Sequence, residues 1–249
     1  MPDKSLSGLK ISIIIPALNE EKLIRRTLTQ FTNSLKKRFE LEIIVSDGGS
    51  TDSTLDIAYE LADRVVLKSK NIPQNISRGR NAGAEISSGD VLVFLNADTY
   101  VLDLETMLNI INEEFKDDSV NALACVIKVF PEEEILSDRM FHTFYNGYVK
   151  FLNKFLMGMG RGECHIVSGK RFREINGYDE EMIAGEDFDL YKRLRKTGKI
   201  KFKKEIVIFE SPRRYRKFGY IKVFWNWTVN SISVFLLGKC VSKSWDPVR

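Results

Sequence analysis

Short apolar runs alternate with amphipathic segments along the first half of the chain. Residues 11–15 form a continuous β-branched run, and residues 41–46 repeat the pattern. Runs of this length predict strands that are buried on both faces, as in parallel sheets. Between them, apolar residues recur at helical spacing over residues 20–37, and a further helix is expected over residues 75–87. The alternation predicts an α/β chain with a mostly parallel, Rossmann-like sheet flanked by helices.

The same patterns predict further elements along the chain. Strands are expected at residues 64–67, 90–95 and 121–130. One helix is expected after the turn at residues 47–52, ending at about residue 62, and further helices are expected at residues 104–115, 134–155 and 187–196. From residue 158 onward we expect short strands mixed with the last of these helices. The pattern shows no linker, so we predict one domain over residues 1–212 and a basic, amphipathic C-terminal extension over residues 213–249.

Composition excludes several classes of protein. Of the 249 residues 43% are apolar and 29% are charged, which is typical of a soluble globular protein. The formal net charge of +4 is too small to indicate a nucleic-acid-binding protein, so no nucleic-acid partner is expected. Three widely spaced cysteines form neither a disulfide framework nor a zinc motif. Since the first ten residues also lack a signal-peptide core, we expect a reducing, cytoplasmic location.

Polar and acidic residues follow three of the predicted strands directly. They stand in the segments PALNE at 16–20, DGGSTD at 47–52 and NADT at 96–99. In an open parallel sheet, ligands bind beyond the carboxyl ends of the strands. Acidic groups combined with glycine suit a ligand that carries hydroxyl donors and lies close to the backbone. A nucleoside fits that description.

Four phrases, in this order and spacing, give the chain a family resemblance. They are IIIPALNEE, IIVSDGGSTDST, GRNAGAEISSGDVLVFLNADT and GEDFDLYKRL, over about residues 11–195. Together they resemble the family 2 glycosyltransferases, which have the GT-A fold. The resemblance implies an enzyme that moves a sugar from a nucleoside diphosphate sugar, such as a UDP- or GDP-sugar, to a hydroxyl of a glycan or lipid-linked acceptor. It further implies inversion at the anomeric carbon and assistance by Mg²⁺ or Mn²⁺.

The resemblance also assigns residues to the nucleotide-sugar site. Asp47 is similar to the family's aspartate that accepts a hydrogen bond from the donor base, and Arg80 lies in the segment beneath the nucleotide. The expected nucleotide-sugar-binding residues are Pro16, Ala17, Asn19, Glu20, Asp47, Gly48, Arg80, Asn81, Asn96, Ala97, Asp98 and Arg214. The alternatives are that Asp47 only shapes a turn and that Glu20 only favours the dipole of the following helix.

The segment Asn96-Ala97-Asp98 stands where the family has its Asp-x-Asp motif. Asp98 keeps the role of an oxygen ligand for a metal that neutralises charge on the leaving diphosphate. Asn96 departs from the pattern and removes one negative charge, which puts tight metal affinity in doubt. His165 is the second candidate metal ligand. The alternative is that His165 only stabilises the fold.

The Glu186-Asp187 pair precedes an amphipathic segment, as in the family. An inverting displacement needs a base for the proton of the attacking hydroxyl, and a positioned carboxylate can supply it. We therefore predict Asp187 as the general base, with Glu186 beside it as an orienting group or acceptor contact. Capping of the following helix is the alternative, and one residue can do both.

Residues 213–237 combine a basic cluster with an aromatic-rich, amphipathic stretch. The stretch is too short and too polar for a membrane span, so an interfacial helix on the inner face of the cell membrane is one prediction. The alternatives are a helix that closes the core, a homodimer interface, or arginines (Arg213, Arg214 and Arg216) that serve the active site.

Two other functions compete with sugar transfer. A nucleotide-sugar-binding protein of the same fold that has lost activity is favoured by Asn96, while the presence of Asp47, Asp98 and Asp187 together argues against it. A sugar-phosphate nucleotidyltransferase normally begins with a glycine-rich loop, whereas the first loop here is acidic. The sequence also lacks the motifs of serine hydrolases and P-loop NTPases.

Overall fold

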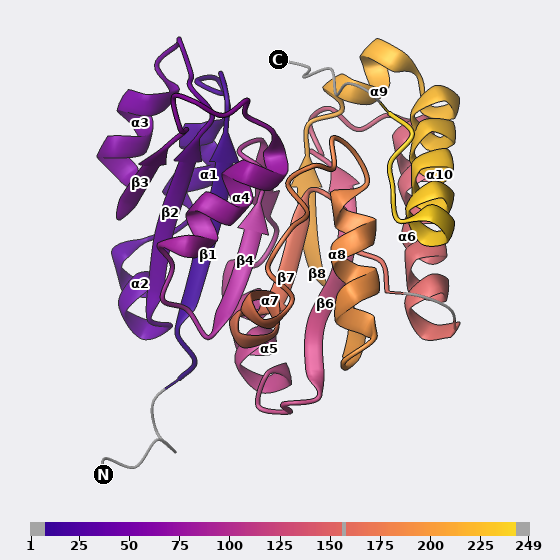
Figure 1. Cartoon of the computed structure of the whole chain (residues 1–249). Coiled ribbons are helices and arrows are strands. Elements are labelled where there is room, and N and C mark those ends of the chain that lie inside the picture. The colour runs from indigo at the N-terminus through magenta and orange to yellow at the C-terminus, as the bar shows by residue number, and fades with distance from the viewer. Residues whose placement is uncertain (1–7, 156–157, 243–249) are drawn as a thin grey trace.

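Within the described residues, eight strands form one mixed sheet in the order β3-β2-β1-β4-β7-β6-β8-β5 (Figure 1). The computed structural model describes residues 8–155 and 158–242. The strands are β1 (Ile11–Ala17), β2 (Leu41–Asp47), β3 (Arg64–Leu67), β4 (Val91–Leu95), β5 (Thr99–Val101), β6 (Val120–Val129), β7 (Cys164–Ser168) and β8 (Lys199–Glu210). Pairs β3-β2, β2-β1, β1-β4 and β6-β8 are parallel, so the predicted α/β class and mostly parallel sheet are confirmed.

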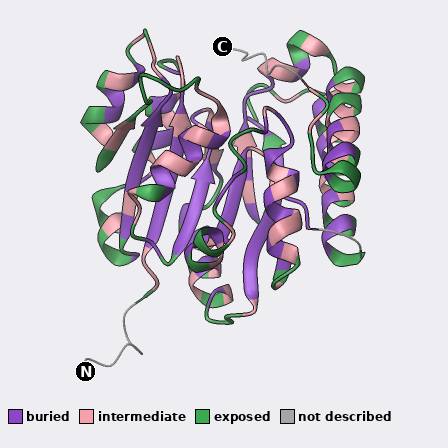
Figure 2. Cartoon of the chain, in the orientation of Figure 1, coloured by how far each residue is buried: buried purple, intermediate pink, exposed green. Residues whose placement is uncertain are grey.

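The central strands are buried on both faces because helices cover both sides of the sheet (Figure 2). In β1, Ile11, Ile13 and Ile15 lie in one hydrophobic cluster, and Ile14 lies in the cluster on the other side. This alternation explains why the strand is a continuous β-branched run. The helices are α1 (Ile24–Thr29), α2 (Asn33–Arg38), α3 (Thr54–Leu61), α4 (Ile76–Glu85), α5 (Leu104–Glu114), α6 (Leu136–Phe155), α7 (Gly169–Glu174), α8 (Glu186–Arg195), α9 (Arg213–Phe218) and α10 (Tyr220–Leu237).

The single helix predicted over residues 20–37 was wrong, since α1 and α2 are separate. Gln30 ends the first helix with its side chain, which donates to the Thr27 carbonyl and accepts from the Val101 amide. Thr32 then caps α2 by accepting a hydrogen bond from the Leu35 amide. These side-chain bonds to the backbone outweigh the helical spacing of the apolar residues.

Strand β6 lies where residues 121–130 predicted a strand, but the apolar pattern did not locate β5, β7 and β8. Strand β8 is the longest in the sheet, but its first half is rich in lysine. Lys201 donates to Glu114 of α5 at 2.7 Å and Lys203 pairs with the same carboxylate. Because these lysines are satisfied by ion pairs, the strand needs fewer apolar residues than a central strand. Strand β7 runs antiparallel to both β4 and β6.

The two C-terminal helices pack against the rest of the chain. Val234 of α10 belongs to the hydrophobic cluster that also contains Leu190 and Leu194 of α8. Lys192 of α8 donates to the carbonyls of Val234 and Phe235 near the end of α10. The division of the chain at residue 213 stays a prediction. Among the described residues, no helix has both the length and the hydropathy needed to cross a membrane.

Candidate active site

A cavity of about 700 Å³ lies at the carboxyl ends of β1, β2 and β4, where the polar loops were expected to meet. Helix α8 and the C-terminal helices complete its wall. The predicted site residues that line it are Pro16, Ala17, Glu20, Gly48, Arg80, Asn96, Ala97, Asp98, Glu186, Asp187 and Arg214. Asn19, Asp47, Asn81 and His165 are outside this lining.

Arg213 joins the first loop to the loop after β4. Its guanidinium donates to both carboxylate oxygens of Glu20, at 2.9 and 2.7 Å, and to Asp98 Oδ2 at 2.9 Å. Burial raises the pKa of Asp98, and the charge of Arg213 opposes that shift. Arg213 is therefore a cation shared by Glu20 and Asp98, the predicted metal ligand.

Arg80 is fully buried on α4 and connects three walls of the cavity. It donates to Glu186 Oε1 at 2.9 Å, to the Gly162 carbonyl at 2.6 Å and to Asn96 Oδ1 at 3.2 Å. Its guanidinium also lies 5.3 Å from the centre of the Tyr178 ring. Asn96 is thus an acceptor for Arg80, and Arg80 holds Glu186 in place.

Asp187 lies on the cavity wall in the first turn of α8. Gly185, with φ of 80°, turns the chain into this helix, and Asp187 Oδ1 accepts a hydrogen bond from the Phe188 amide at 2.9 Å. Burial, followed by the negative charge of Glu186, raises the pKa of Asp187 to about 8. A carboxylate with a raised pKa beside a cavity can accept a proton near neutral pH.

Asp47 and Asn19 organise the loops without lining the cavity. Asp47 is buried and accepts hydrogen bonds from the amides of Gly49, at 2.8 Å, and Ser50, at 3.0 Å. Asn19 has φ of 54°, donates its amide to Ser50 Oγ and accepts from the Thr51 amide. Asp47 therefore shapes its own loop, and Asn19 fixes the first loop against the second. The contact of Asp47 with a donor base stays a prediction.

Asn81 and His165 bind the segment before α8. Asn81 donates to the Tyr178 carbonyl and to Glu180, and accepts from the Tyr178 amide. His165 is fully buried on β7, with Nδ1 2.7 Å from the Tyr178 hydroxyl. Burial is the main cause that lowers the pKa of His165 well below its usual value, and the positive charge of Arg80 adds to it, so the ring is neutral. The structure does not bring His165 to the cavity with Asp98.

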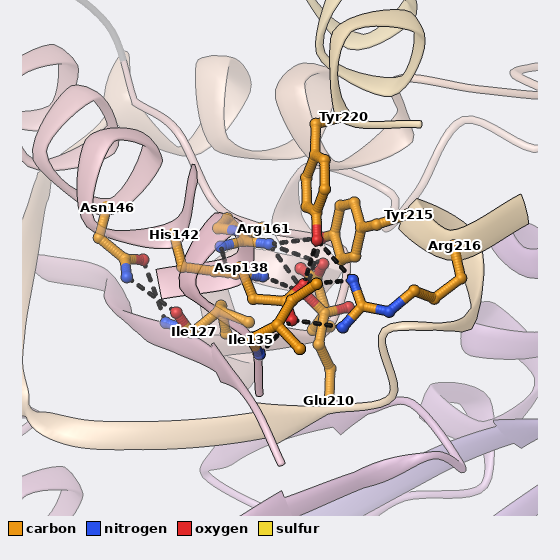
Figure 3. A network of polar contacts seen from close by, with 11 residues as sticks. Ile127, Ile135, Asp138, His142, Asn146, Arg161, Glu210, Tyr215, Arg216 and Tyr220 are labelled. Carbon is orange, nitrogen blue, oxygen red and sulfur yellow. Dashed lines mark hydrogen bonds and ion pairs between the residues drawn. The ribbon is translucent and has the colours of Figure 1, made fainter. Parts of the chain in front are cut away.

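Figure 3 shows a buried polar network that the sequence did not reveal. Its residues Arg161, Glu163 and Glu210 line the cavity, and we call them the cavity floor. Arg161 donates to Glu163 at 3.0 Å, to Glu210 at 3.1 Å, to the Tyr215 hydroxyl and to His142 Nδ1. Burial and the nearby Glu163 raise the pKa of Glu210 well above its usual value. Burial also acts to raise the pKa of Glu163, but Arg161 and hydrogen bonds to its carboxylate together outweigh burial and lower it.

The chemistry of the donor set decides whether a divalent cation suits this site. In the described part of the chain, no three histidine, cysteine or acidic side chains are grouped closely enough to hold a metal by themselves. Mg²⁺ in nucleotide sites is commonly held by one or two carboxylates together with substrate phosphates. Asp98, a carboxylate on the cavity wall, fits that arrangement.

Comparison with known proteins gives a family match and distant relatives. A family model described as glycosyl transferase family 2 matches residues 12–172. The GalNAc(5)-diNAcBac-PP-undecaprenol beta-1,3-glucosyltransferase of Campylobacter jejuni subsp. jejuni is 28% identical over 234 residues, or 91% of this chain and 71% of that protein. A dolichyl N-acetyl-alpha-D-glucosaminyl phosphate 3-beta-D-2,3-diacetamido-2,3-dideoxy-beta-D-glucuronosyltransferase of Methanococcus voltae is 29% identical over 208 residues, or 76% of this chain and 62% of that one.

Solved structures confirm the expected GT-A fold. A mannosyltransferase from Pyrobaculum calidifontis, in complex with GDP-Man and Mn²⁺, matches with a TM-score of 0.65 and 18% identity, covering 90% of this chain and 65% of that one. At this identity the likeness concerns the fold. The chain spans 23% to 62% of the lengths of the first four curated relatives it matches.

Proposed function

Since this chain belongs to glycosyl transferase family 2, we propose that it transfers a sugar from a nucleoside diphosphate sugar to an acceptor hydroxyl, with inversion at the anomeric carbon. The observation that carries the proposal is the cavity itself. The loops after β1 and β4 and the start of α8 bring Asp98 and Asp187 to its walls together with Arg80 and Arg214. Arginines suit a diphosphate, and a raised-pKa carboxylate suits proton removal.

The donor end of the cavity is formed by the loops that follow β1, β2 and β4. Asp98 would hold Mg²⁺ or Mn²⁺, which when bound neutralises charge on the leaving diphosphate. The P. calidifontis structure, which contains GDP-Man and Mn²⁺, supports a donor and a metal of this kind. Arg214, which lines the cavity on α9, would contact the diphosphate, and Gly48 allows the nucleoside to approach the backbone.

Asp187 is the proposed general base. As the acceptor oxygen attacks the anomeric carbon, its proton passes to the Asp187 carboxylate and the nucleoside diphosphate leaves with the electrons of the broken bond. Arg80 donates a hydrogen bond to Glu186 at 2.9 Å and so holds it in place. The negative charge of Glu186 helps to keep the pKa of Asp187 raised. Attack from the side opposite to the leaving group gives inversion.

We propose a lipid-linked glycan as the acceptor. The names of the two relatives support this, since one carries a PP-undecaprenol group and the other a dolichyl phosphate group. The wall of the cavity formed by α9 and α10 also suits such a molecule. It contains Lys222 and Arg214, which could meet phosphate, and the aromatic side chains of Phe218 and Trp227, which could meet a sugar ring.

Replacing Asp98 by alanine tests the donor end of the site. We expect the affinity for GDP or UDP in the presence of Mn²⁺ to fall by at least about tenfold, or 1.4 kcal/mol, because the protein loses its carboxylate ligand. Without Mn²⁺ the wild type and the variant should bind alike. Calorimetry with and without metal measures both. Asp118→Ala, an exposed aspartate outside the cavity, is the control. Unchanged metal dependence in Asp98→Ala would remove Asp98 from the site.

The raised pKa of Asp187 predicts how transfer depends on pH. A base must be ionised, so kcat/KM should fall about tenfold for each pH unit below about 8 and level off above it. Glu186→Gln removes the neighbouring charge and should move this limb to lower pH. Rates measured from about pH 6 to pH 9.5 at acceptor concentrations well below KM, where they report kcat/KM, test both statements. A flat wild-type profile would contradict the assignment.

A further inference from the structure

Helix α6 carries a row of apolar side chains that face solvent. Leu136, Met140, Phe144, Phe151 and Phe155 are each more than half exposed, from 51% to 71%. They follow one another at intervals of four and seven residues, so they share one side of the helix. The opposite side of α6 is buried against the sheet and contributes Val149 and Leu152 to the core, so the row lies on the solvent-facing side of the helix.

Helix α10 carries a second row of the same kind. Ile221, Trp225, Ile232 and Leu236 are 88%, 66%, 53% and 69% exposed. Their spacings of four, seven and four residues again place them on one side of a helix. Val223 and Val234, on another side of α10, are buried.

The two rows adjoin. The ring of Phe224 on α10 lies 5.7 Å from that of Phe144, which is itself a member of the α6 row. Trp227 packs on Tyr145, with ring centroids 5.4 Å apart. The helices run side by side at one end of the molecule, and exposed residues extend along both (Figures 1 and 2). We call the nine side chains of the two rows the α6–α10 face.

The exposed charges on α6, α9 and α10 are basic, whereas Glu132 and Glu133, just before α6, are exposed acids. Helices α9 and α10 contain no acidic residue, and the acid of α6, Asp138, is buried and paired with Arg216. Lys150, Lys154, Lys217 and Lys222 are exposed on the three helices. An apolar, aromatic-rich surface bordered by lysines complements a layer of anionic head groups above acyl chains.

We propose that the α6–α10 face rests on the surface of an anionic lipid bilayer, with both helices lying in the interface. Lys222 borders the face and also lines the cavity, so the cavity opens beside the bilayer. This position would give a lipid-linked acceptor a short path to Asp187. In that respect the inference deepens the proposed function and rests on it for the acceptor, whereas docking itself does not depend on sugar transfer.

Flotation of the full chain with vesicles tests the docking. One set of vesicles contains phosphatidylglycerol and phosphatidylcholine, and the other contains phosphatidylcholine alone. The test variant is Met140→Glu with Ile221→Glu, which puts one charge in each row at strongly exposed positions. The matched control is Tyr59→Glu with Leu102→Glu, which changes exposed apolar residues on other parts of the surface.

The wild type and the control should float with the anionic vesicles, and less so as salt rises. The test variant should bind at least about tenfold more weakly with an unchanged unfolding temperature. Equal flotation of the test variant, or a wild type that floats with neither vesicle, would overturn the proposal. So would a dimer in light scattering that the test variant converts to a monomer, since the face would then join two copies. Because flotation needs no donor, vesicle binding can hold even where transfer of sugar fails.

Discussion

Replacing Asp187 by asparagine is expected to lower the rate of sugar transfer by at least about 10²-fold, which is the range for loss of a positioned general base. Asparagine keeps the size of the side chain and its oxygen can still accept from the Phe188 amide, so α8 should remain intact. It has no carboxylate to receive the proton of the acceptor hydroxyl. The affinity for the nucleoside diphosphate should change little, since the loss is specific to the transition state.

Asp189→Asn is the matched control for this experiment. Asp189 lies in the same turn of α8, pairs with Arg193 at 2.6 Å and is absent from the cavity lining. It should keep transfer within a few-fold of the wild type. Native-rate transfer by Asp187→Asn would give the base role to another group. Glu163→Gln is then the next variant to measure, because Glu163 is the carboxylate of the cavity floor whose pKa is lowered.

The first half of the fold was predictable because its signals are local. The run at Ile13 and its neighbours is buried on both faces, and such runs are read directly from the sequence. Strand β8 was not predicted because its lysines are paired with Glu114, which is far away in the sequence. The break between α1 and α2 was not predicted for a similar reason, since the Gln30 side chain accepts a hydrogen bond from the amide of Val101, which is distant in the sequence.

The residues of the candidate site likewise fall into those that the sequence predicted and those that it did not. Asp98 and Asp187 follow recognisable segments, and the structure brings both to one cavity. Arg161 and Glu210 carry no local signal, because their burial and contacts arise only when β7, β8 and α9 meet. Arg213, expected only as one of several basic residues, proved to bind Glu20 and Asp98 directly.

Arg161→Met should destabilise the protein strongly. The Arg161 side chain is 2% exposed and holds Glu163 and Glu210, which are 10% and 11% exposed. Methionine fills much of the volume but leaves two carboxylates buried without their cation. Breaking a buried pair in this way typically costs about 3–5 kcal/mol of unfolding free energy. Urea unfolding at pH 7 measures the loss. Arg25→Met breaks a solvent-exposed surface pair with Glu60 and should lower the unfolding free energy far less.

The dependence on pH separates this cause from simple loss of packing. Without Arg161, the folded-state pKa of Glu163 should rise above its usual value, and that of Glu210, which is already raised in the wild type, should rise further. Such groups destabilise the folded state most at high pH, and the penalty falls as they take up protons. The difference in unfolding free energy between wild type and Arg161→Met should therefore shrink from pH 7 toward pH 5. Adding Glu210→Gln should recover part of the loss at pH 7. A difference that is the same at both pH values would mean that Arg161 acts through its packing and not through its charge.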